Sequence, residues 1–304
     1  MKVGIVGVGY VGSATGYAMV LRGSCRELVL IDKNEKKAVA EAHDMLHAAP
    51  FSNPVEVYAG TYADLKGAEV VILAAGVNQL PGESRLALLE RNAAIFREIV
   101  PQVLRHESGA ILIVATNPVD IITALTEREA GGANPRVFGS GTTLDTARFR
   151  ALLGGFAGVD ARHVHAYVVG EHGDSEVLVW SGATIAGLGF EDFCRSRRIA
   201  FSEEEKKIID ENVRRAAYKI IEGKGATAFG IGAVLARITE SILRREKAIY
   251  TISRYNPLFG TALSLPHVVS EAGAIELVGI KLSDEENLQL EKSATVLKSY
   301  LEKL

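Results

Sequence analysis

Short apolar segments alternate with longer amphipathic segments over the first 140 residues of the chain. Strands buried on both faces read as continuous apolar runs, whereas helices repeat their apolar positions every three or four residues. The pattern predicts strands at 2–6, 27–32, 55–60, 70–76, 110–118 and 136–141, and helices that include 10–23, 34–49 and 84–106. Strands that alternate with helices are typical of a parallel sheet covered on both faces. We therefore predict an α/β fold with a doubly wound parallel (Rossmann) sheet in the N-terminal half.

The order of the elements changes after residue 142. The pattern then predicts helices at 145–156, 202–223, 227–246 and from Ser283 onward, and strands at 164–170, 176–180, 248–253, 261–266 and 274–283. The last three strands follow one another closely, which favours antiparallel pairing. We therefore predict two closely packed domains, a Rossmann domain over 1–142 and a mixed α+β domain over 143–304.

The composition narrows the classes of partner and compartment. The 304 residues carry a net charge of −3, which gives no electrostatic reason to expect nucleic acid or an anionic membrane as a partner. The two cysteines, Cys25 and Cys194, form no C-x-x-C motif and no Cys/His cluster, so we expect neither a disulfide framework nor a metal site. No apolar run approaches the roughly 20 residues of a membrane helix. We therefore expect a cytoplasmic protein.

A glycine motif stands between the first strand and the first helix. Gly7, Gly9 and Gly12 form G-x-G-x-x-G, and Asp32 closes the second strand twenty residues after Gly12. In a dinucleotide site, the first glycine permits a tight turn, the second admits the pyrophosphate and the third lets helix and strand pack. A carboxylate at the second strand binds ribose hydroxyls and repels a 2′-phosphate, so NAD is favoured over NADP. The alternative is an ordinary strand-to-helix turn.

A histidine flanked by acids interrupts the apolar pattern of the second half. His172 lies in the segment GEHGDSE, and a histidine titrates near neutral pH, which suits proton transfer to or from a substrate. The alternative is a plain turn at Gly173-Asp174. A histidine base needs an orienting carboxylate, which Asp145 can supply. Arg148, three residues after Asp145, shares its helix face and can bind a substrate carboxylate, although an intrahelical ion pair is the alternative.

The segment GVNQLPGESR, residues 76–85, begins where the strand at 70–76 ends. Ligands of doubly wound sheets bind at the carboxyl ends of the strands. A loop rich in glycine, proline and polar residues that ends in arginine is typical of a lid over a site. The alternative is an ordinary surface loop.

These motifs together resemble those of bacterial L-lactate dehydrogenases. The glycine motif with Asp32, NQLPGESR, ATNPVD, GSGTTLDTARFR, VHAYVVGEHGDSE and EGKGATAFGIG occur in the same order, and the resemblance runs essentially from Met1 to the C-terminus. It implies NAD-dependent, reversible reduction of pyruvate to (S)-lactate in glycolysis and fermentation. His172 would exchange the proton with the substrate, and Asp145 would orient the imidazole of His172 and favour its protonated form. Arg148 would bind the substrate carboxylate, and Arg85 would polarise the carbonyl.

The resemblance also implies further contacts. Asn117 and Thr227 would contact the substrate, Ser140 the nicotinamide carboxamide, and Ile231 the nicotinamide ring. The remaining cofactor contacts would be Val11, Lys37, Tyr62, Gly76, Val77, Ala115 and Thr116, together with Asn117. Members of the family are tetramers.

The lid distinguishes lactate from malate dehydrogenases of the same superfamily. Malate dehydrogenases carry an arginine where this chain has Gln79, which offers no counter-ion to the second carboxylate of oxaloacetate. The alternatives are a malate dehydrogenase or a broader 2-hydroxy acid dehydrogenase. Leu80, Ala228-Phe229 and the short loop within 253–266 depart from the commoner bacterial pattern and leave lid rate and substrate breadth open. A sensor of NAD redox state without turnover is a more distant alternative, which would not need the reaction residues.

Two further positions match a regulatory site of the family. Arg150 lies two residues beyond Arg148, on a different side of the helix, and His165 precedes His172 by seven residues. They correspond to the residues by which some bacterial lactate dehydrogenases bind fructose 1,6-bisphosphate between subunits. The resemblance therefore implies an effector-activated homotetramer. The alternative is an ordinary surface arginine and a turn histidine.

Overall fold

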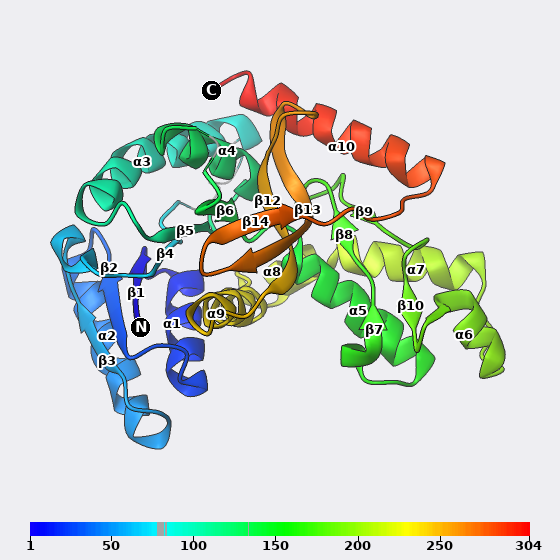
Figure 1. The fold of residues 1–304 in the computed structure, drawn as a ribbon, viewed down its shortest axis with the longest axis horizontal. Helices are drawn as coiled ribbons and strands as arrows, with labels where there is room; N and C mark the ends of the chain where they lie inside the picture. The colour runs from blue at the N-terminus through cyan, green and yellow to red at the C-terminus, as the bar shows by residue number, and fades with distance from the viewer. Residues whose placement is uncertain (78–81, 83, 133) are drawn as a thin grey trace.

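The computed structural model describes residues 1–77, 82, 84–132 and 134–304. Its centre is a nine-stranded sheet in the order β14-β13-β12-β6-β5-β4-β1-β2-β3 (Figure 1). The first six strands are β1 (Lys2–Val6), β2 (Glu27–Ile31), β3 (Glu56–Ala59), β4 (Val70–Leu73), β5 (Ile111–Val114) and β6 (Val137–Gly139). All six are parallel, and the chain reverses its direction of winding between β1 and β4. The predicted doubly wound α/β sheet is confirmed.

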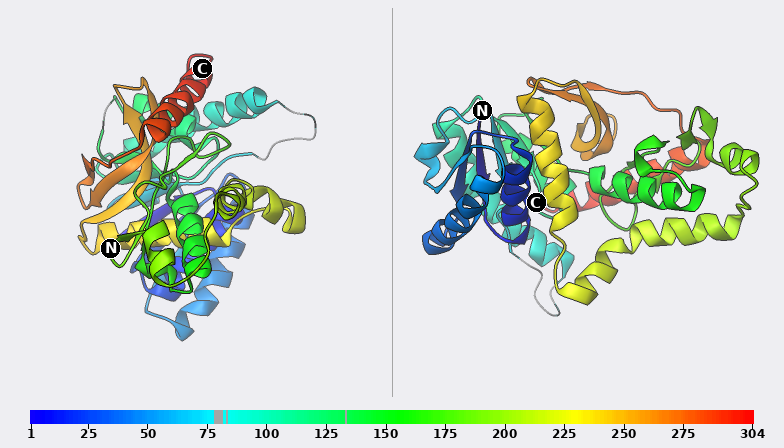
Figure 2. Two further views of the ribbon diagram at one scale, coloured as in Figure 1. Left: turned by 90° about the vertical axis from the view of Figure 1, so that its right-hand side faces the viewer. Right: turned by 90° about the horizontal axis from the view of Figure 1, so that it is seen from below.

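Helices cover both faces of this sheet because its strands are apolar on both sides. Val70 and Ile72 of β4 pack in one core with residues of α1 (Tyr10–Arg22), α2 (Glu35–Ala48) and α9 (Phe229–Leu243). Val71 and Leu73 point to the other face, against α3 (Arg85–His106), α4 (Val119–Glu129) and α10 (Asp284–Leu301). Figure 2 shows α9 beside α1, so a helix of the second half covers the Rossmann sheet.

Three strands of the second half extend the same sheet. β12 (Ala248–Asn256), β13 (Thr261–Ser270) and β14 (Gly273–Leu277) pair antiparallel as predicted, and β12 joins β6 through Ser253 and Gly139. The third strand is shorter than the predicted 274–283. After β14, Ile280 and Leu282 pack against the core without strand pairing. Burial, rather than sheet formation, explains the apolar pattern at those positions.

The strands predicted at 164–170 and 176–180 are fragments in different small sheets. The structure has β7 (Val164–His165), β8 (Val168–Val169), β9 (Val177–Leu178), β10 (Thr184–Ile185) and β11 (Leu188–Gly189). β8 and β9 pair antiparallel, so residues 170–176 connect the two strands of a hairpin. β7 to β10 share a third core with α5 (Thr143–Ala157), α6 (Phe190–Ser196) and α7 (Glu203–Arg214). The acid-flanked histidine therefore lies at the tip of a hairpin that rests on a packed core.

The single helix predicted at 202–223 bends at Arg215 into α7 and α8 (Ala216–Lys224). Hydrogen bonding continues across the bend, since Arg215 N donates to Glu211 O at 2.8 Å. α7 buries Ile209 and Val213, whereas none of the described side chains of α8 is buried. Packing of buried side chains therefore fixes the direction of α7, whereas no buried side chain ties α8 to that same direction. Short 3-10 helices occur at η1 (Ala49–Phe51), η2 (Tyr62–Leu65) and η3 (Ala161–His163). Within the described part of the chain, no helix is long and apolar enough to cross a membrane.

Candidate active site

The three glycines of the motif occupy positions with different steric demands. Gly7 has φ +95°, and a Cβ there would lie 2.4 Å from the backbone of Ala75. A Cβ on Gly12 would lie 2.0 Å from Gly7 O. A Cβ on Gly9 would meet no atom of the described residues within 4 Å. The first and third glycines are therefore required by the fold itself, and the second leaves open space at the start of α1, where a pyrophosphate fits.

Asp32 fixes the glycine loop from the end of β2. Its Oδ2 accepts a hydrogen bond from Val8 N at 2.9 Å, and its Oδ1 accepts one from Asn34 N at 2.9 Å. A carboxylate has more acceptor positions than these two bonds use. Asp32 therefore stabilises the loop and retains capacity for ribose hydroxyls, so its surroundings fit the adenosine half of NAD.

The other predicted cofactor residues lie mainly where β4, β5 and β6 end. Gly76 and Val77 follow β4, Ala115, Thr116 and Asn117 follow β5, and Ser140 follows β6. Val11 lies on α1, Lys37 on α2, Tyr62 on η2 and Ile231 on α9. Parallel strands bring their carboxyl ends to one edge, beside the reversal between β1 and β4. The sheet thus gathers segments that are far apart in the sequence.

A buried asparagine that sequence reasoning missed links two of these loops. Asn92 of α3 is 1% exposed, accepts a hydrogen bond from Val77 N at 2.9 Å and donates to Asn117 O at 2.9 Å. Thr116 Oγ1 adds a bond to Ala75 O at 2.7 Å. The loops after β4 and β5 therefore hold a fixed separation. In the sequence, Asn92 is one polar residue in a long amphipathic helix, and nothing marks it as buried.

His172 and Arg148 meet on the two oxygens of Asp145. His172 Nδ1 lies 2.5 Å from Asp145 Oδ2, and Arg148 Nη1 lies 2.7 Å from Asp145 Oδ1. The side chain of Asp145 is 3% exposed, whereas those of His172 and Arg148 are 23% and 15% exposed. The predicted trio is therefore brought together, with the acid buried and the two cations partly open. The sequence left open whether Arg148 only pairs with Asp145 inside the helix or also lies beside His172. Arg148 makes the intrahelical pair, and the same carboxylate also contacts His172.

Backbone contacts hold the hairpin against α5. Val168 N of β8 donates to Thr146 Oγ1 at 2.9 Å, and Gly170 exchanges two backbone hydrogen bonds with Ser264 of β13, at 2.9 and 2.8 Å. Gly170 has φ +87°, and a Cβ there would lie 2.7 Å from Ser293 Oγ of α10. Glu171 N also donates to Ser293 Oγ at 2.8 Å, so α5, β13 and α10 all anchor the hairpin on the N-terminal side of His172.

A second buried acid, also missed by sequence reasoning, holds the histidine backbone. His172 N donates to Asp120 Oδ2 at 2.7 Å, and Ser264 Oγ lies 3.4 Å from Asp120 Oδ1. Burial raises the pKa of Asp120 to about 6, while the nearby Ser253 hydroxyl and the hydrogen bond from His172 N oppose the increase. An acid in the first turn of a helix, as in NPVD, is common for electrostatic reasons alone. The sequence therefore offers no specific signal for this contact.

The pairing with Asp145 favours the charged form of the histidine. Burial alone would lower the pKa of His172, but the charge and hydrogen bond of Asp145 outweigh it and raise the pKa from 6.5 to about 9. Asp120 and Glu176 act in the same direction. Burial would likewise raise the pKa of Asp145, but His172 and Arg148 lower it. At neutral pH the site therefore holds an imidazolium and a carboxylate, with a guanidinium beside them.

Other predicted substrate residues are less completely defined. Asn117 is exposed beside the end of β5, and Thr227 is half-buried just before α9. Arg85 is the first residue of α3, whose N-cap Ser84 accepts a hydrogen bond from Ala87 N at 3.1 Å. Gln79 and Leu80, the predicted specificity positions of the lid, lie outside the described residues, as does the side chain of Arg85. Ala228 caps the start of α9, and Phe229 is 76% exposed.

The two predicted effector residues lie close together, away from Asp145. Arg150 Nε donates to Ala166 O at 2.9 Å, and its guanidinium stacks 5.3 Å from the centre of the Tyr167 ring. His165, the residue before Ala166, is exposed. A cavity of about 410 Å³ beside it is lined by Arg162, His163, His165 and Arg197, among others. Several cationic groups therefore surround this part of the surface.

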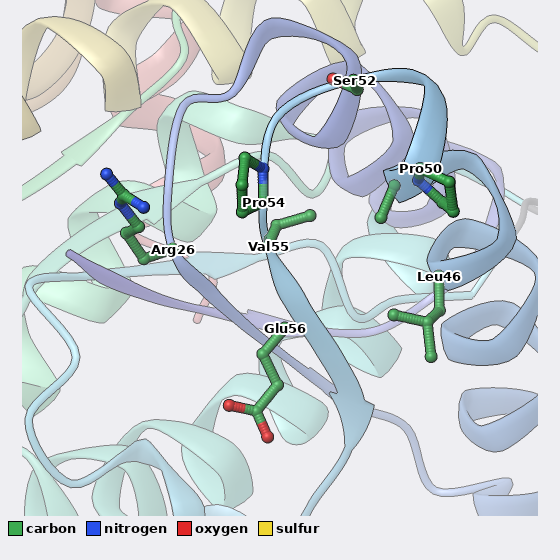
Figure 3. A pocket seen from close by; sticks show the side chains of 8 residues that line it. Arg26, Leu46, Pro50, Ser52, Pro54, Val55 and Glu56 are labelled. Atoms are coloured by element: carbon green, nitrogen blue, oxygen red, sulfur yellow. The ribbon is translucent and has the colours of Figure 1, made fainter.

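A larger cavity lies elsewhere and contains none of the predicted residues. It measures about 810 Å³ and is lined by Arg26, Leu46, Ala49, Pro50, Ser52, Pro54, Val55 and Glu56 (Figure 3). These residues surround the start of β3, the outermost parallel strand. We therefore assign the candidate site from the residues of the hairpin and the strand ends, and not from the volume of this cavity.

Two protein-family models match the chain, one over its N-terminal half and one over its C-terminal half. Residues 1–139 match the lactate/malate dehydrogenase NAD binding domain, and residues 142–304 match the lactate/malate dehydrogenase alpha/beta C-terminal domain. The chain belongs to the lactate/malate dehydrogenase family. As the glycine motif and Asp32 predicted, it is an NAD-dependent oxidoreductase.

Relatives within this family are similar along the whole chain. An L-lactate dehydrogenase of Chloroherpeton thalassium is 58% identical over 99% of both chains, and one of Thermus aquaticus is 54% identical over 98% of this chain and 97% of its own. The crystal structure of a minor L-lactate dehydrogenase from Enterococcus mundtii superposes with a TM-score of 0.95 at 41% identity, covering 100% of this chain and 98% of the other. The predicted resemblance to bacterial L-lactate dehydrogenases is confirmed.

The glycine motif of this dehydrogenase provides a matched pair of variants. Gly9→Ala places a methyl group in the open space and keeps a backbone conformation that alanine adopts readily, since φ is −73°. We expect unchanged or slightly higher stability, by up to about 1 kcal/mol, with at least about tenfold weaker NADH binding. Gly12→Ala should instead lower the free energy of unfolding, because its methyl group meets Gly7 O. Urea denaturation and NADH fluorescence titration measure the two effects. Wild-type NADH affinity in Gly9→Ala would contradict the assignment.

The histidine–aspartate pair predicts a measurable titration. In the protein without ligands, the pKa of His172 followed by imidazole nitrogen NMR should be about 9. Because this value exceeds the ordinary 6.5, the pair stabilises the fold fully below pH 6.5 and loses that contribution as the pH rises through 9. Asp145→Asn should lower the pKa of His172, since burial is then no longer opposed by a carboxylate. Asp160→Asn, at an exposed pair with Arg162, is the control and should leave it unchanged.

Proposed function

We propose that the chain is an L-lactate dehydrogenase that reversibly reduces pyruvate to (S)-lactate. The observation that carries this proposal is the buried Asp145, which holds both His172 and Arg148 beside the strand ends of an NAD-binding sheet. A 2-oxo acid needs a proton donor for its carbonyl and a cation for its carboxylate. The names of the similar proteins, which are L-lactate dehydrogenases, support the same substrate.

His172 is the proton donor in this proposal. Its Nδ1 is engaged by Asp145, so Nε2 is the nitrogen left to face the substrate. NADH, held by the glycine motif, Asp32 and the strand ends, would supply the hydride for the carbonyl carbon of pyruvate. The carbonyl oxygen takes the proton from Nε2, and the imidazole becomes neutral beside the Asp145 carboxylate. In the reverse direction the neutral imidazole accepts the hydroxyl proton of lactate.

Arg148 binds the substrate carboxylate in this proposal. A guanidinium has five N–H groups in a planar fork, and its bond to Asp145 Oδ1 holds the plane of that fork in place. Its side chain is 15% exposed, so a carboxylate that binds there is largely removed from water. Asn117, Thr227 and Arg85 complete the proposed substrate contacts. The proposed contacts to the cofactor are the residues that the resemblance names, from Val11 to Ile231.

Malate dehydrogenase is the second candidate, and Gln79 opposes it. Oxaloacetate carries an additional carboxylate, which needs a cation when the lid closes and water is excluded. Gln79 is neutral, so we propose that the site prefers pyruvate to oxaloacetate. Malate dehydrogenases share the fold and the Asp145, Arg148 and His172 positions, so Gln79 is the position on which this distinction depends.

Steady-state kinetics test the proposed function. We expect NADH oxidation with pyruvate to exceed that with oxaloacetate in kcat/KM. His172→Asn should lower turnover by about 10²–10⁴-fold or more, because the proton donor is lost while the NADH contacts remain. His106→Asn, an exposed residue at the end of α3, is the matched control and should retain wild-type turnover. Near-normal turnover of the His172 variant would exclude it as the proton donor.

We further propose that fructose 1,6-bisphosphate activates a homotetramer through Arg150 and His165. Arg150 bonds the backbone of Ala166, the residue next to His165, and His165 lines the cavity together with Arg162, His163 and Arg197, which supports an anionic ligand. Two subunits that each bring this cluster together would repel one another until an anion separates the charges. An anion that binds one quaternary state better shifts the population toward it.

Titration of fructose 1,6-bisphosphate at subsaturating pyruvate tests this regulation. We expect the KM for pyruvate to fall by about 5–150-fold, the usual range of allosteric coupling. Arg150→Gln should abolish the response, whereas Arg195→Gln, at an exposed pair on α6, should preserve it. A flat response of the wild-type protein would refute the regulatory proposal and leave the catalytic one intact.

The remaining assignments complete the proposal. Residues 1–142 would form the NAD-binding domain and 143–304 the substrate domain, which the boundary between the two family matches supports. The enzyme would act in the cytoplasm, in glycolysis and pyruvate fermentation. Cys25 and Cys194 carry free, buried thiols, as is usual in a reducing compartment.

A further inference from the structure

A buried carboxyl beside the catalytic pair has no role in the reaction derived above. Glu176 lies four residues after His172, directly before β9, and is 4% exposed. Its Oε1 has no hydrogen-bond partner among the residues that the structure describes. Buried carboxylates are normally paired or hydrogen-bonded, because the charge is costly to remove from water. A buried carboxyl with one unbonded oxygen at this position therefore requires an explanation.

Most of the charges that act on Glu176 belong to the proposed substrate site. They are those of Asp145 and Arg148 on α5 and of His172 in the same loop, and Arg214 of α7 adds a fourth. Arg214 is committed elsewhere: its Nε bonds Asp210 Oδ2 at 2.7 Å, and its Nη1 donates to the backbone oxygens of Asp174 and Glu176. Arg148 Nη1 and His172 Nδ1 both bond Asp145. The surrounding cations are thus attached to other acceptors.

A carboxyl in these surroundings takes up a proton near neutral pH. Burial raises the pKa of Glu176 to about 8, and the negative charge of Asp145 adds to the increase. The positive charges of His172, Arg214 and Arg148 oppose it without cancelling it. The proton makes Glu176 neutral at pH 7, and it is lost as the pH rises through about 8.

The charge of Glu176 bears directly on an anionic substrate. While Glu176 is neutral, the two positive charges of Arg148 and the His172 imidazolium are matched by the two negative charges of Asp145 and Asp120. An ionised Glu176 would add a negative charge beside Arg148 and compete electrostatically with the substrate carboxylate. We propose that Glu176 is a positioning residue whose proton must be present for tight binding of the 2-oxo acid. This inference rests on the proposed function, and it assigns a second titrating group to the same site.

The proposal is tested by the pH dependence of ligand binding. Oxamate, the unreactive amide analogue of pyruvate, is titrated into the NADH complex between pH 6.5 and 9.5, for wild type, Glu176→Gln and Glu211→Gln. In the wild type, the Kd of oxamate should rise by up to about tenfold per pH unit above pH 8, first from Glu176 and then also from His172. Glu176→Gln should lose the first of these steps. Glu211→Gln, an exposed residue of α7, should match the wild type.

Proton uptake on binding provides the decisive measurement. At pH 8.5 in weak buffer, with indicator dye, the wild type should take up roughly 0.5–0.8 proton more per oxamate than Glu176→Gln. If Glu176 only fills space, the wild type and Glu176→Gln would show equal proton uptake and equal pH profiles of oxamate binding. That result would overturn the proposal. If the variant does not fold, infrared difference spectra of the wild type should show a protonated carboxyl forming on oxamate binding, and the absence of that band would overturn it. Pyruvate turnover by the wild type at pH 7 separately decides the proposed function.

Discussion

The site depends on one buried carboxylate. A carboxylate that is almost fully removed from water is stable only when cations or hydrogen-bond donors occupy its oxygens. Asp145 meets this requirement with His172 on one oxygen and Arg148 on the other. Because the buried acid needs both bonds, the two groups that we propose to bind and protonate a 2-oxo acid are held in place before any ligand binds. The interaction that stabilises the buried acid would also organise the proposed reaction.

This arrangement requires the two halves of the chain to form one structure. Asp145 follows β6 by six residues, His172 follows the β8 strand, and Ser264 of β13 links the two regions through its bonds to Gly170 and Thr142. β12 pairs directly with β6, so the sheet that binds NAD continues into the strands that support the hairpin. The relative position of cofactor and histidine is therefore set by backbone hydrogen bonds and not by a flexible connection between domains.

The sequence predicted features that depend on local pattern or on chemistry with a fixed spacing. The six parallel strands follow from continuous apolar runs, and the roles of Gly7, Gly9 and Gly12 follow from turn geometry. The extension of the sheet by β12–β14 could not be predicted, because pairing between distant segments leaves no periodic signal in either one. The fragmentation of 164–180 was missed for a related reason, since buried coil and buried strand are equally apolar. Asn92, Asp120 and Glu176 were missed because a polar residue carries no mark of its burial until the fold is known.

The neighbours of His172 also explain why its imidazole is protonated at neutral pH. Asp145 raises the pKa of His172 to about 9, so the free site at neutral pH already carries the proton that the proposed carbonyl reduction would require. Lactate oxidation requires the neutral imidazole and must first release that proton, which becomes easier as the pH rises. Ionisation of Glu176 above about pH 8 opposes that release, because a second ionised acid raises the pKa of His172 and, in our proposal, weakens the hold on the substrate carboxylate. The site thus holds its histidine charged with an ionised acid on the imidazole, and in our proposal it keeps Glu176 neutral so that no further negative charge opposes the substrate carboxylate.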